Sequence, residues 1–246
     1  MTDVSDQQLL GDLFRQLSRA GALSEAEREA LADAVVTVRT YPARAMIVPA
    51  HVDQQDSKLL LDGFVSRQNE LADGRRQILA IHVPGDFVDL HGLLLRRLDH
   101  EVVALTPARM AIMSHVALRR ITVDHPRLAR MLWFLTAVDA AIHREWIASL
   151  GRPAAQRIAH LMCELHCRLE IVNRADRTGY ALPLTQADLA DATALTPVHV
   201  NRTLRNLRER GLVDFRGGRV EILNLRDLCR LAGFDGDYLY LDRGEI

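Results

Sequence analysis

The sequence predicts an α+β protein with a jelly-roll-like β-roll near the N-terminus, one long helix, and a C-terminal helix-turn-helix with a β-hairpin wing. Three observations predict this architecture. Short strand-like runs separated by turn signals fill residues 45–113, and an unbroken helical pattern covers residues 124–150. Further on, the helix caps Thr185 and Thr196 precede two strand-like runs joined by Gly217-Gly218.

Composition limits the class of protein. The 246 residues are enough for a substantial core, and 31 basic residues nearly balance 32 acidic ones. Net charge therefore does not indicate a nucleic-acid partner. Cys163, Cys167 and Cys229 are too few for a disulfide scaffold. No stretch resembles a signal peptide or a membrane span, so we expect a cytoplasmic protein without a membrane partner.

Two helices are predicted over residues 5–37. The first has one apolar stripe, formed by Leu9, Leu10, Leu13, Phe14 and Leu17. It ends near Gly21, and a capping box at Ser24 opens the second helix, predicted to run through Val35.

The following segment alternates strands and breaks. The predicted strands are 45–48, 58–67, 76–83 and 101–113, with a hairpin turn at Asp73-Gly74 and breaks at 84–86 and 106–108. Such regular short strands are typical of a β-roll or jelly roll. We place this N-terminal domain at residues 1–123.

The long helix is predicted to begin at the cap Asp124 and to end at Gly151. Its apolar positions follow alternating steps of four and three residues along a seam formed by Leu128, Leu132, Leu135, Asp139, Ile142 and Trp146. One interpretation is an ordinary buried core helix. The other, which we favour, is a dimerisation helix over 124–151 that packs against both its own β-roll and a twin helix.

The C-terminal domain is placed at 152–246, after a predicted hinge at Gly151-Arg152-Pro153. A helix follows through Leu169, then a polar loop over 173–180, a short helix over 224–232 and a tail over 234–241 that packs back on the body.

The central motif of this domain is a helix-turn-helix. Thr185 caps a short helix with Asp188 at its third position, and Thr196 caps a second helix that has Pro197 at its first position. The strands 213–216 and 219–222 form the wing.

The second helix of the motif has two faces. Val200, Thr203, Leu204 and Leu207 are predicted to pack inward. The opposite face carries arginines, and from Thr196 to Arg219 there are six arginines against Glu209 and Asp214. This local positive charge predicts binding to double-stranded DNA.

The motif resembles the winged helix of the Crp/Fnr family of bacterial transcription regulators. Residues 195–202 read Leu-Thr-Pro-Val-His-Val-Asn-Arg, as in many members. The resemblance extends over nearly the whole chain and implies a sensor domain of the cyclic-nucleotide-binding type, a homodimer, an inverted-repeat operator, and RNA polymerase as a further partner. It leaves activator or repressor open.

Roles at the DNA follow from residue chemistry. Arg202 is predicted to read a guanine through its O6 and N7 atoms. Val198, where relatives often have Glu, would touch a thymine methyl, and Asn201 would add a polar contact. Phosphate contacts are assigned to Thr185, Gln186, Thr196, His199, Arg205, Arg216 and Arg219. Ala194 stands where the turn commonly has glycine.

The sensor segment departs from the nucleotide-binding members of the family. These carry a Gly-Glu pair and then Arg-Ser or Arg-Thr, and neither pair is present in residues 88–100, which follow Phe87. Only Arg96 and Arg97 remain as candidate effector ligands for an anion. We therefore expect no cyclic nucleotide, although a cyclic-nucleotide-, haem- or redox-responsive sensor stays the alternative.

Two further groups of Cys and His residues could bind a metal or have ordinary structural roles. Cys163, Cys167 and His160 lie near one another on a helix but lack the spacing and fourth ligand of a zinc or iron–sulfur site. His82, His91 and His100 are candidate haem or metal ligands, with ordinary core histidines as the alternative. The chain has no His-x-His pair of a cupin-type enzyme, no phosphate loop and no nucleophile elbow. We predict no catalytic residues, no metal, no iron–sulfur cluster and no haem.

Overall fold

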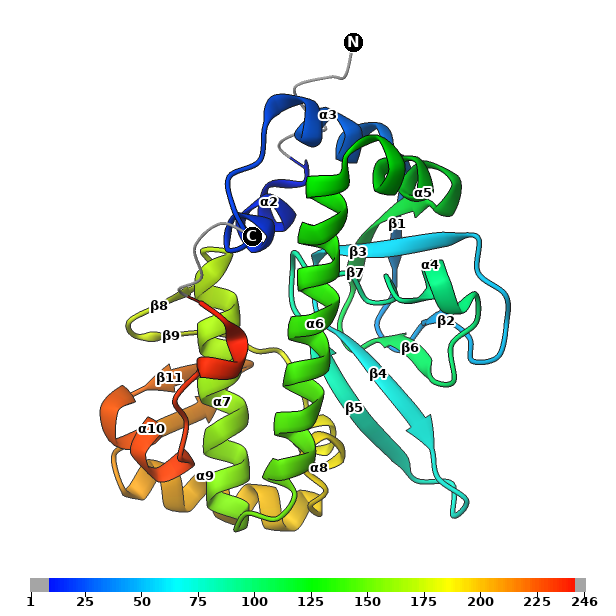
Figure 1. Cartoon of the computed structure of the whole chain (residues 1–246). Coiled ribbons are helices and arrows are strands. Elements are labelled where there is room, and N and C mark those ends of the chain that lie inside the picture. Colours follow the sequence, from blue (N-terminus) through cyan, green and yellow to red (C-terminus); the bar gives the residue numbers. More distant parts are fainter. Residues whose placement is uncertain (1–8, 242–246) are drawn as a thin grey trace. The chain divides into compact units, whose positions relative to one another are not determined.

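The computed structural model describes residues 9–241 (Figure 1). Within this range the chain divides into two compact units. The first contains residues 9–68, 81–140 and 240–241, and the second contains 69–80 and 141–239. The domain boundaries at 123/124 and 151/152 stay predictions. The predicted start of the first helix at residue 5 lies outside the described residues.

The first unit contains the β-roll. Its elements are the helices α2 (Gly11–Ser18), α3 (Glu25–Asp33), α4 (Gly92–Leu95) and α5 (His115–Asp124), and the strands β1 (Val35–Tyr41), β2 (Met46–Val48), β3 (Asp56–Asp62), β4 (Val65–Glu70), β5 (Arg76–His82), β6 (Glu101–Ala104) and β7 (Ala108–Ser114). The tip of the hairpin between β4 and β5, residues 69–80, belongs to the second unit. Antiparallel strands form one sheet in the order β1-β7-β3 and another in the order β2-β6-β4-β5.

The apolar core of the roll explains why these segments form strands. Leu60, Val65, Val102 and Met110 come from four different strands and are fully buried in one cluster. The alternating and continuous apolar runs of the sequence thus fill a common interior. The predicted fold class is confirmed.

Several predicted elements need correction in this unit. The predicted second helix ends at Asp33, and Val35 opens strand β1 instead. The predicted strand 58–67 is two strands, because the backbone turns at Gly63, where an added Cβ would lie only 2.3 Å from the Pro107 carbonyl oxygen. The predicted strand 101–113 likewise divides at Thr106-Pro107, into β6 and β7.

The long helix α6 (Pro126–Ser149) begins later than predicted. Asp124 does not cap it, because this residue ends the preceding helix α5, which the sequence pattern did not predict. Ser114 caps α5 by accepting a hydrogen bond from the Val116 amide. No helix formed by residues 9–241 is both long and apolar enough to cross a membrane.

The second unit contains the helix-turn-helix and its wing. Its elements are the helices α7 (Ala154–Ile171), α8 (Gln186–Thr193), α9 (Pro197–Glu209) and α10 (Leu225–Ala232), the 3₁₀ helix η1 (Asp237–Leu239), and the strands β8 (Ala175–Asp176), β9 (Gly179–Ala181), β10 (Val213–Arg216) and β11 (Arg219–Ile222). The strands form one sheet in the order β10-β11-β9-β8.

Two features of this unit differ from or extend the prediction. The segment 173–180, predicted as a loop, contains β8 and part of β9, which extend the wing sheet beside β11. The tail packs back as predicted, since Tyr238 stacks on His160 and its hydroxyl donates to Glu164 at 2.8 Å.

Candidate nucleic-acid interface

Local hydrogen bonds define the two helices of the motif. The Thr185 hydroxyl accepts from the Asp188 amide, while Asp188 Oδ2 accepts from the Thr185 amide at 2.9 Å, which completes the predicted capping box. The turn residue Ala194 is left-handed, with φ 51° and ψ 45°. Thr196 caps α9 by accepting from the His199 amide at 3.2 Å, with Pro197 at the first helical position.

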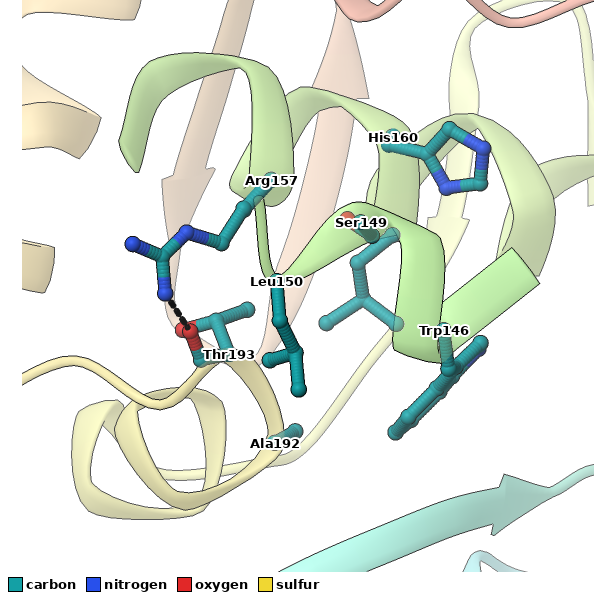
Figure 2. A pocket seen from close by; sticks show the side chains of 8 residues that line it. Trp146, Ser149, Leu150, Arg157, His160, Ala192 and Thr193 are labelled. Atoms are coloured by element: carbon teal, nitrogen blue, oxygen red, sulfur yellow. Dashed lines mark hydrogen bonds between the residues drawn. The ribbon is translucent and has the colours of Figure 1, made fainter. Parts of the chain in front are cut away.

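Arg157 on α7 holds the turn between α8 and α9, a contact that no motif in the sequence predicts. Its guanidinium donates to the Thr193 carbonyl oxygen at 2.8 Å (Figure 2). It also donates to the Arg152 carbonyl oxygen at 2.9 Å. The nearby hollow, lined also by Trp146 and His160, has a volume of about 20 Å³, enough for one water molecule but not for an effector. Arg157 therefore acts as a brace for the turn between α8 and α9.

The recognition helix α9 has the two predicted faces. Val200 and Leu207 are fully buried, and Thr203 and Leu204 are nearly so. On the other face the Val198 side chain is 79% exposed, and Asn201, Arg202 and Arg205 are exposed beside it. Asn201 donates to Gln186 on α8 at 3.2 Å, so the exposed faces of the two helices are joined.

The wing is a tight hairpin. Gly217 and Gly218 both have positive φ, as a two-residue turn with the twist of a hairpin requires. Arg216 pairs with Asp214 at 3.2 Å, and Arg219 donates to the Thr178 hydroxyl at 3.1 Å. The Arg216 side chain is more than half exposed and the Arg219 side chain is nearly half exposed. Both guanidinium groups are therefore accessible to phosphates.

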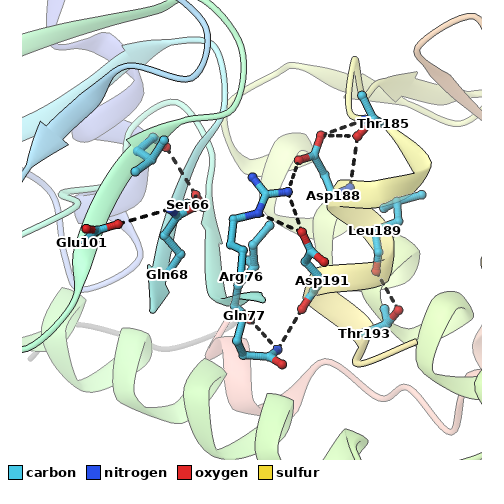
Figure 3. A network of polar contacts seen from close by, with 12 residues as sticks. Ser66, Gln68, Arg76, Gln77, Glu101, Thr185, Asp188, Leu189, Asp191 and Thr193 are labelled. Carbon is cyan, nitrogen blue, oxygen red and sulfur yellow. Dashed lines mark hydrogen bonds and ion pairs between the residues drawn. The ribbon is translucent and has the colours of Figure 1, made fainter. Parts of the chain in front are cut away.

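The hairpin between β4 and β5 contributes a second set of contacts to α8. Arg76 donates to Asp188 at 2.7 Å and to Asp191 at 2.8 Å, and Gln77 donates to the Asp191 carbonyl oxygen at 2.8 Å (Figure 3). The Asp188 carboxylate is fully buried, so it requires such partners. Together these contacts of Arg76 and Gln77 form a clamp on α8, which no motif in the sequence indicated.

The predicted dimer seam of α6 needs correction. Leu128, Leu132 and Ile142 are buried within the chain itself, so a second subunit cannot reach them. Asp139 pairs with Arg67 at 2.6 Å, and Trp146 donates to Glu164 at 3.0 Å. Leu135 is half-buried. The apolar seam thus faces inward, because a continuous apolar stripe fits the chain's own core as well as it fits a twin helix.

A different face of α6 is exposed. It is formed by Arg130, Trp133, Ala137, Ala140, Arg144 and Ile147. These positions also alternate steps of three and four residues, as the seam of a coiled coil does. Trp133 is 73% exposed and Ile147 is 70% exposed, which is unusual for such large apolar side chains.

The candidate effector residues do not line an interior. Arg96 and Arg97 are exposed beside α4, and Arg97 pairs with Asp53 at 3.1 Å. The buried acid of this segment is Asp89, which accepts from the Lys58 amide at 2.6 Å. Burial raises the pKa of Asp89 to about 6, although Lys58 opposes this shift.

The interior of the roll instead holds histidines. His82 is almost fully buried, and the rings of His91 and His100 lie 5.6 Å apart. Burial, and then the charge of Arg67, lower the pKa of His82 and of His91 to about 4. Within the described residues, no three His, Cys, Asp or Glu side chains are arranged to hold a metal ion.

Comparison with known proteins places these features in a family. Residues 38–125 match the cyclic nucleotide-binding domain, and residues 156–231 match the Crp-like helix-turn-helix domain. A nitrogen fixation regulation protein FixK from Rhizobium meliloti is 30% identical over 172 residues, which cover 68% of this chain and 75% of the relative. The chain belongs to the Crp/Fnr family of transcription regulators. This regulator is therefore a DNA-binding protein and not an enzyme.

Two further similarities span most of the regulator. The transcriptional activator protein FnrL of Cereibacter sphaeroides is 25% identical over 221 residues, 88% of each chain. The structure of FixK2 from Bradyrhizobium japonicum is similar with a TM-score of 0.71 and 27% identity, over 79% of this chain and 96% of that one. The winged helix and the β-roll are thus both typical of the family.

Proposed function

We propose that this regulator is a homodimer that binds an inverted-repeat operator with α9 of each subunit in the major groove. The exposed face of α9 supports this proposal most directly. Val198 and Arg202 extend from this helix, Thr196 caps its N-terminus, and Arg157 holds the turn that precedes it. A two-fold axis would place the two helices about 34 Å apart, one turn of DNA.

The dimer interface is proposed at the exposed face of α6. Ala137 and Ala140 lie at its centre, where small side chains allow two helices to approach closely, and Trp133 lies one turn before them. This assignment replaces the seam expected from the sequence.

Base reading and phosphate binding are assigned to different arginines. Arg202 would bridge the O6 and N7 atoms of a guanine, so Arg202→Ala should cost about 1–3 kcal/mol and relax specificity at one base pair. Arg216→Ala should weaken binding to all sequences alike and reduce the slope of affinity against salt by about one ion.

The test is a titration of each variant against a selected operator and against random DNA at several salt concentrations. Arg226→Ala serves as the matched control, because Arg226 is an exposed arginine on α10, outside α9 and the wing. An unchanged ratio of operator to random affinity for Arg202→Ala would remove its role in base reading.

The signal is proposed to act at the β-roll without a cyclic nucleotide. The support is the exposed position of Arg96 and Arg97, together with the absence of the Gly-Glu pair and of an Arg-Ser or Arg-Thr pair from residues 88–100, where nucleotide-binding members carry them. We expect cyclic AMP and cyclic GMP to leave operator affinity unchanged in a fluorescence titration. A tenfold increase with either nucleotide would contradict this, and a Soret absorption band would favour the haem alternative.

A further inference from the structure

Two thiols from distant parts of the sequence lie in contact in the second unit. Cys163 on α7 and Cys229 on α10 are 66 positions apart, yet their Sγ atoms are separated by 3.6 Å. The contact exists because α10 packs closely along α7. Cys167 lies one turn beyond Cys163 on the same helix.

The two sulfur atoms have different environments. Cys163 is almost fully buried, whereas Cys229 is half-buried. The hydrogen bond between the two thiols lowers the pKa of Cys229 to about 7, while the same contact and burial raise the pKa of Cys163. Burial raises the pKa of Cys167 to about 12. Cys229 is therefore the thiolate that an oxidant meets first, with a second thiol in contact with it.

We propose that Cys163 and Cys229 form a reversible intramolecular disulfide when the protein meets a hydroperoxide. The Cys229 thiolate attacks one peroxide oxygen, the O–O bond breaks, and the leaving oxygen takes up a proton to give an alcohol or water. Cys163 then attacks the resulting sulfenic sulfur, the S–O bond breaks, and water leaves with the Cys163 proton. The peroxide is reduced by two electrons, and the two thiols supply them.

The geometry requires little rearrangement. A disulfide has an S–S bond of about 2.05 Å, so the sulfur atoms need to approach by only about 1.5 Å, within the range of side-chain rotation. Cys167 is also near enough to Cys229 for the charge of Cys229 to act on it, but the thiol in direct contact with Cys229 is Cys163, at 3.6 Å.

The bond would connect α10 covalently to the helix that organises the DNA-binding motif. α7 carries Arg157, which holds the turn before α9, and α7 also packs directly against α9. Oxidation would therefore fasten the segment after the wing to α7, the helix that packs against α9. Disulfides of this kind inside cells are usually transient and redox-sensing. The site does not depend on the proposed operator or dimer.

The test uses the full-length reduced protein treated with hydrogen peroxide, then with an alkylating agent. Digestion at arginine and also at glutamate separates Cys163 from Cys167, because Glu164 lies between them. We expect an intact mass lower by about 2 Da before alkylation, and one linked peptide pair containing Cys163 and Cys229 after digestion. We also expect full reversal by dithiothreitol and a Tm raised by several degrees in the oxidised form.

Cys167→Ser is the matched control and should keep the linked pair, whereas Cys229→Ser should abolish it. The wild-type mapping needs no variant, so a folding defect cannot obscure the result. Alkylation of both Cys163 and Cys229 after peroxide treatment would overturn the proposal. So would a bond to Cys167, a disulfide between two molecules, or sulfinic acid at Cys229 beside an unreacted Cys163.

Discussion

Glu164 illustrates how single buried charges are accommodated in this regulator. Its carboxylate is completely buried and accepts hydrogen bonds from Trp146 Nε1, from the Tyr238 hydroxyl at 2.8 Å and from Arg168 at 3.1 Å. A buried carboxylate without such donors would cost several kcal/mol. Trp146 was predicted at a dimer seam from its spacing alone, and its indole instead satisfies a charge on the neighbouring helix.

His82 is a buried histidine whose protonation makes the stability of the protein depend on pH. Its pKa in the folded protein is about 4, against about 6.5 in an unfolded chain, because burial and Arg67 disfavour the imidazolium. The contribution of neutral His82 to the free energy of unfolding is therefore complete above pH 6.5, and it is lost as the pH falls toward 4. For His82 the loss amounts to about 3 kcal/mol over that range.

His82→Gln should reduce the fall in stability between pH 7 and pH 4.5, as measured by urea denaturation at both values. The charged and titratable neighbours Arg67, Asp86, Asp139 and His91 remain in the variant. His51→Asn, on an exposed turn with positive φ that Asn tolerates, is the control. An equally steep fall for His82→Gln and wild type would show that His82 is not held neutral.

At the scale of elements, the hairpin between β4 and β5 is the feature with the widest consequences. Its residues 69–80 belong to the same compact unit as the helix-turn-helix, whereas residues 9–68 and 81–140 belong to the unit of the β-roll. Arg76 and Gln77 hold α8 through both carboxylates and one carbonyl oxygen. A turn signal at Asp73-Gly74 predicts the hairpin, but its partner depends on packing that local spacing does not encode.

Arg76→Ala should destabilise the second unit by about 2 kcal/mol, because the buried Asp188 loses its guanidinium partner. In a double-mutant cycle with Asp191→Ala, the two effects should not add, with a coupling of about 1 kcal/mol measured by denaturation. Arg75→Ala is the matched control, since Arg75 is exposed and pairs with Asp73 on the same hairpin. Equal stability of the Arg75 and Arg76 variants would exclude the clamp.

At the scale of the whole molecule, assembly depends on which face of α6 remains exposed. Two seams with the same three-and-four spacing run along this helix, and only one can face the chain's own core. The more apolar seam was buried. Burial of Leu128, Leu132 and Ile142 yields hydrophobic stabilisation, whereas burial of the other seam would also remove the charges of Arg130 and Arg144 from water. The exposed seam is the one at which the dimer interface is proposed.

Trp133→Glu should convert the proposed dimer into a monomer, because it introduces a charge into the face where two copies of α6 meet. Sedimentation velocity at micromolar concentration measures this directly. Val123→Glu is the matched control, since Val123 is equally exposed, at 74% against 73%, but lies on α5. An unchanged sedimentation coefficient for Trp133→Glu would place the dimer interface elsewhere.

Local sequence determined the helix-turn-helix, the wing and most strands of the roll, but neither strand β1 nor the break at Gly63. Caps such as Thr185 and Thr196, the Gly217-Gly218 turn and the inward face of α9 act over a few residues, so spacing alone reveals them. The family follows from the same residues.

Only the tertiary structure decided which residues meet across the chain. It placed Arg157 on the turn, Arg76 on α8, Cys229 against Cys163, and the predicted dimer seam in the core. Each of these contacts joins segments from different elements, and a helical or strand period constrains only which residues share a face. What that face contacts depends on competition among all apolar and charged surfaces of the folded chain.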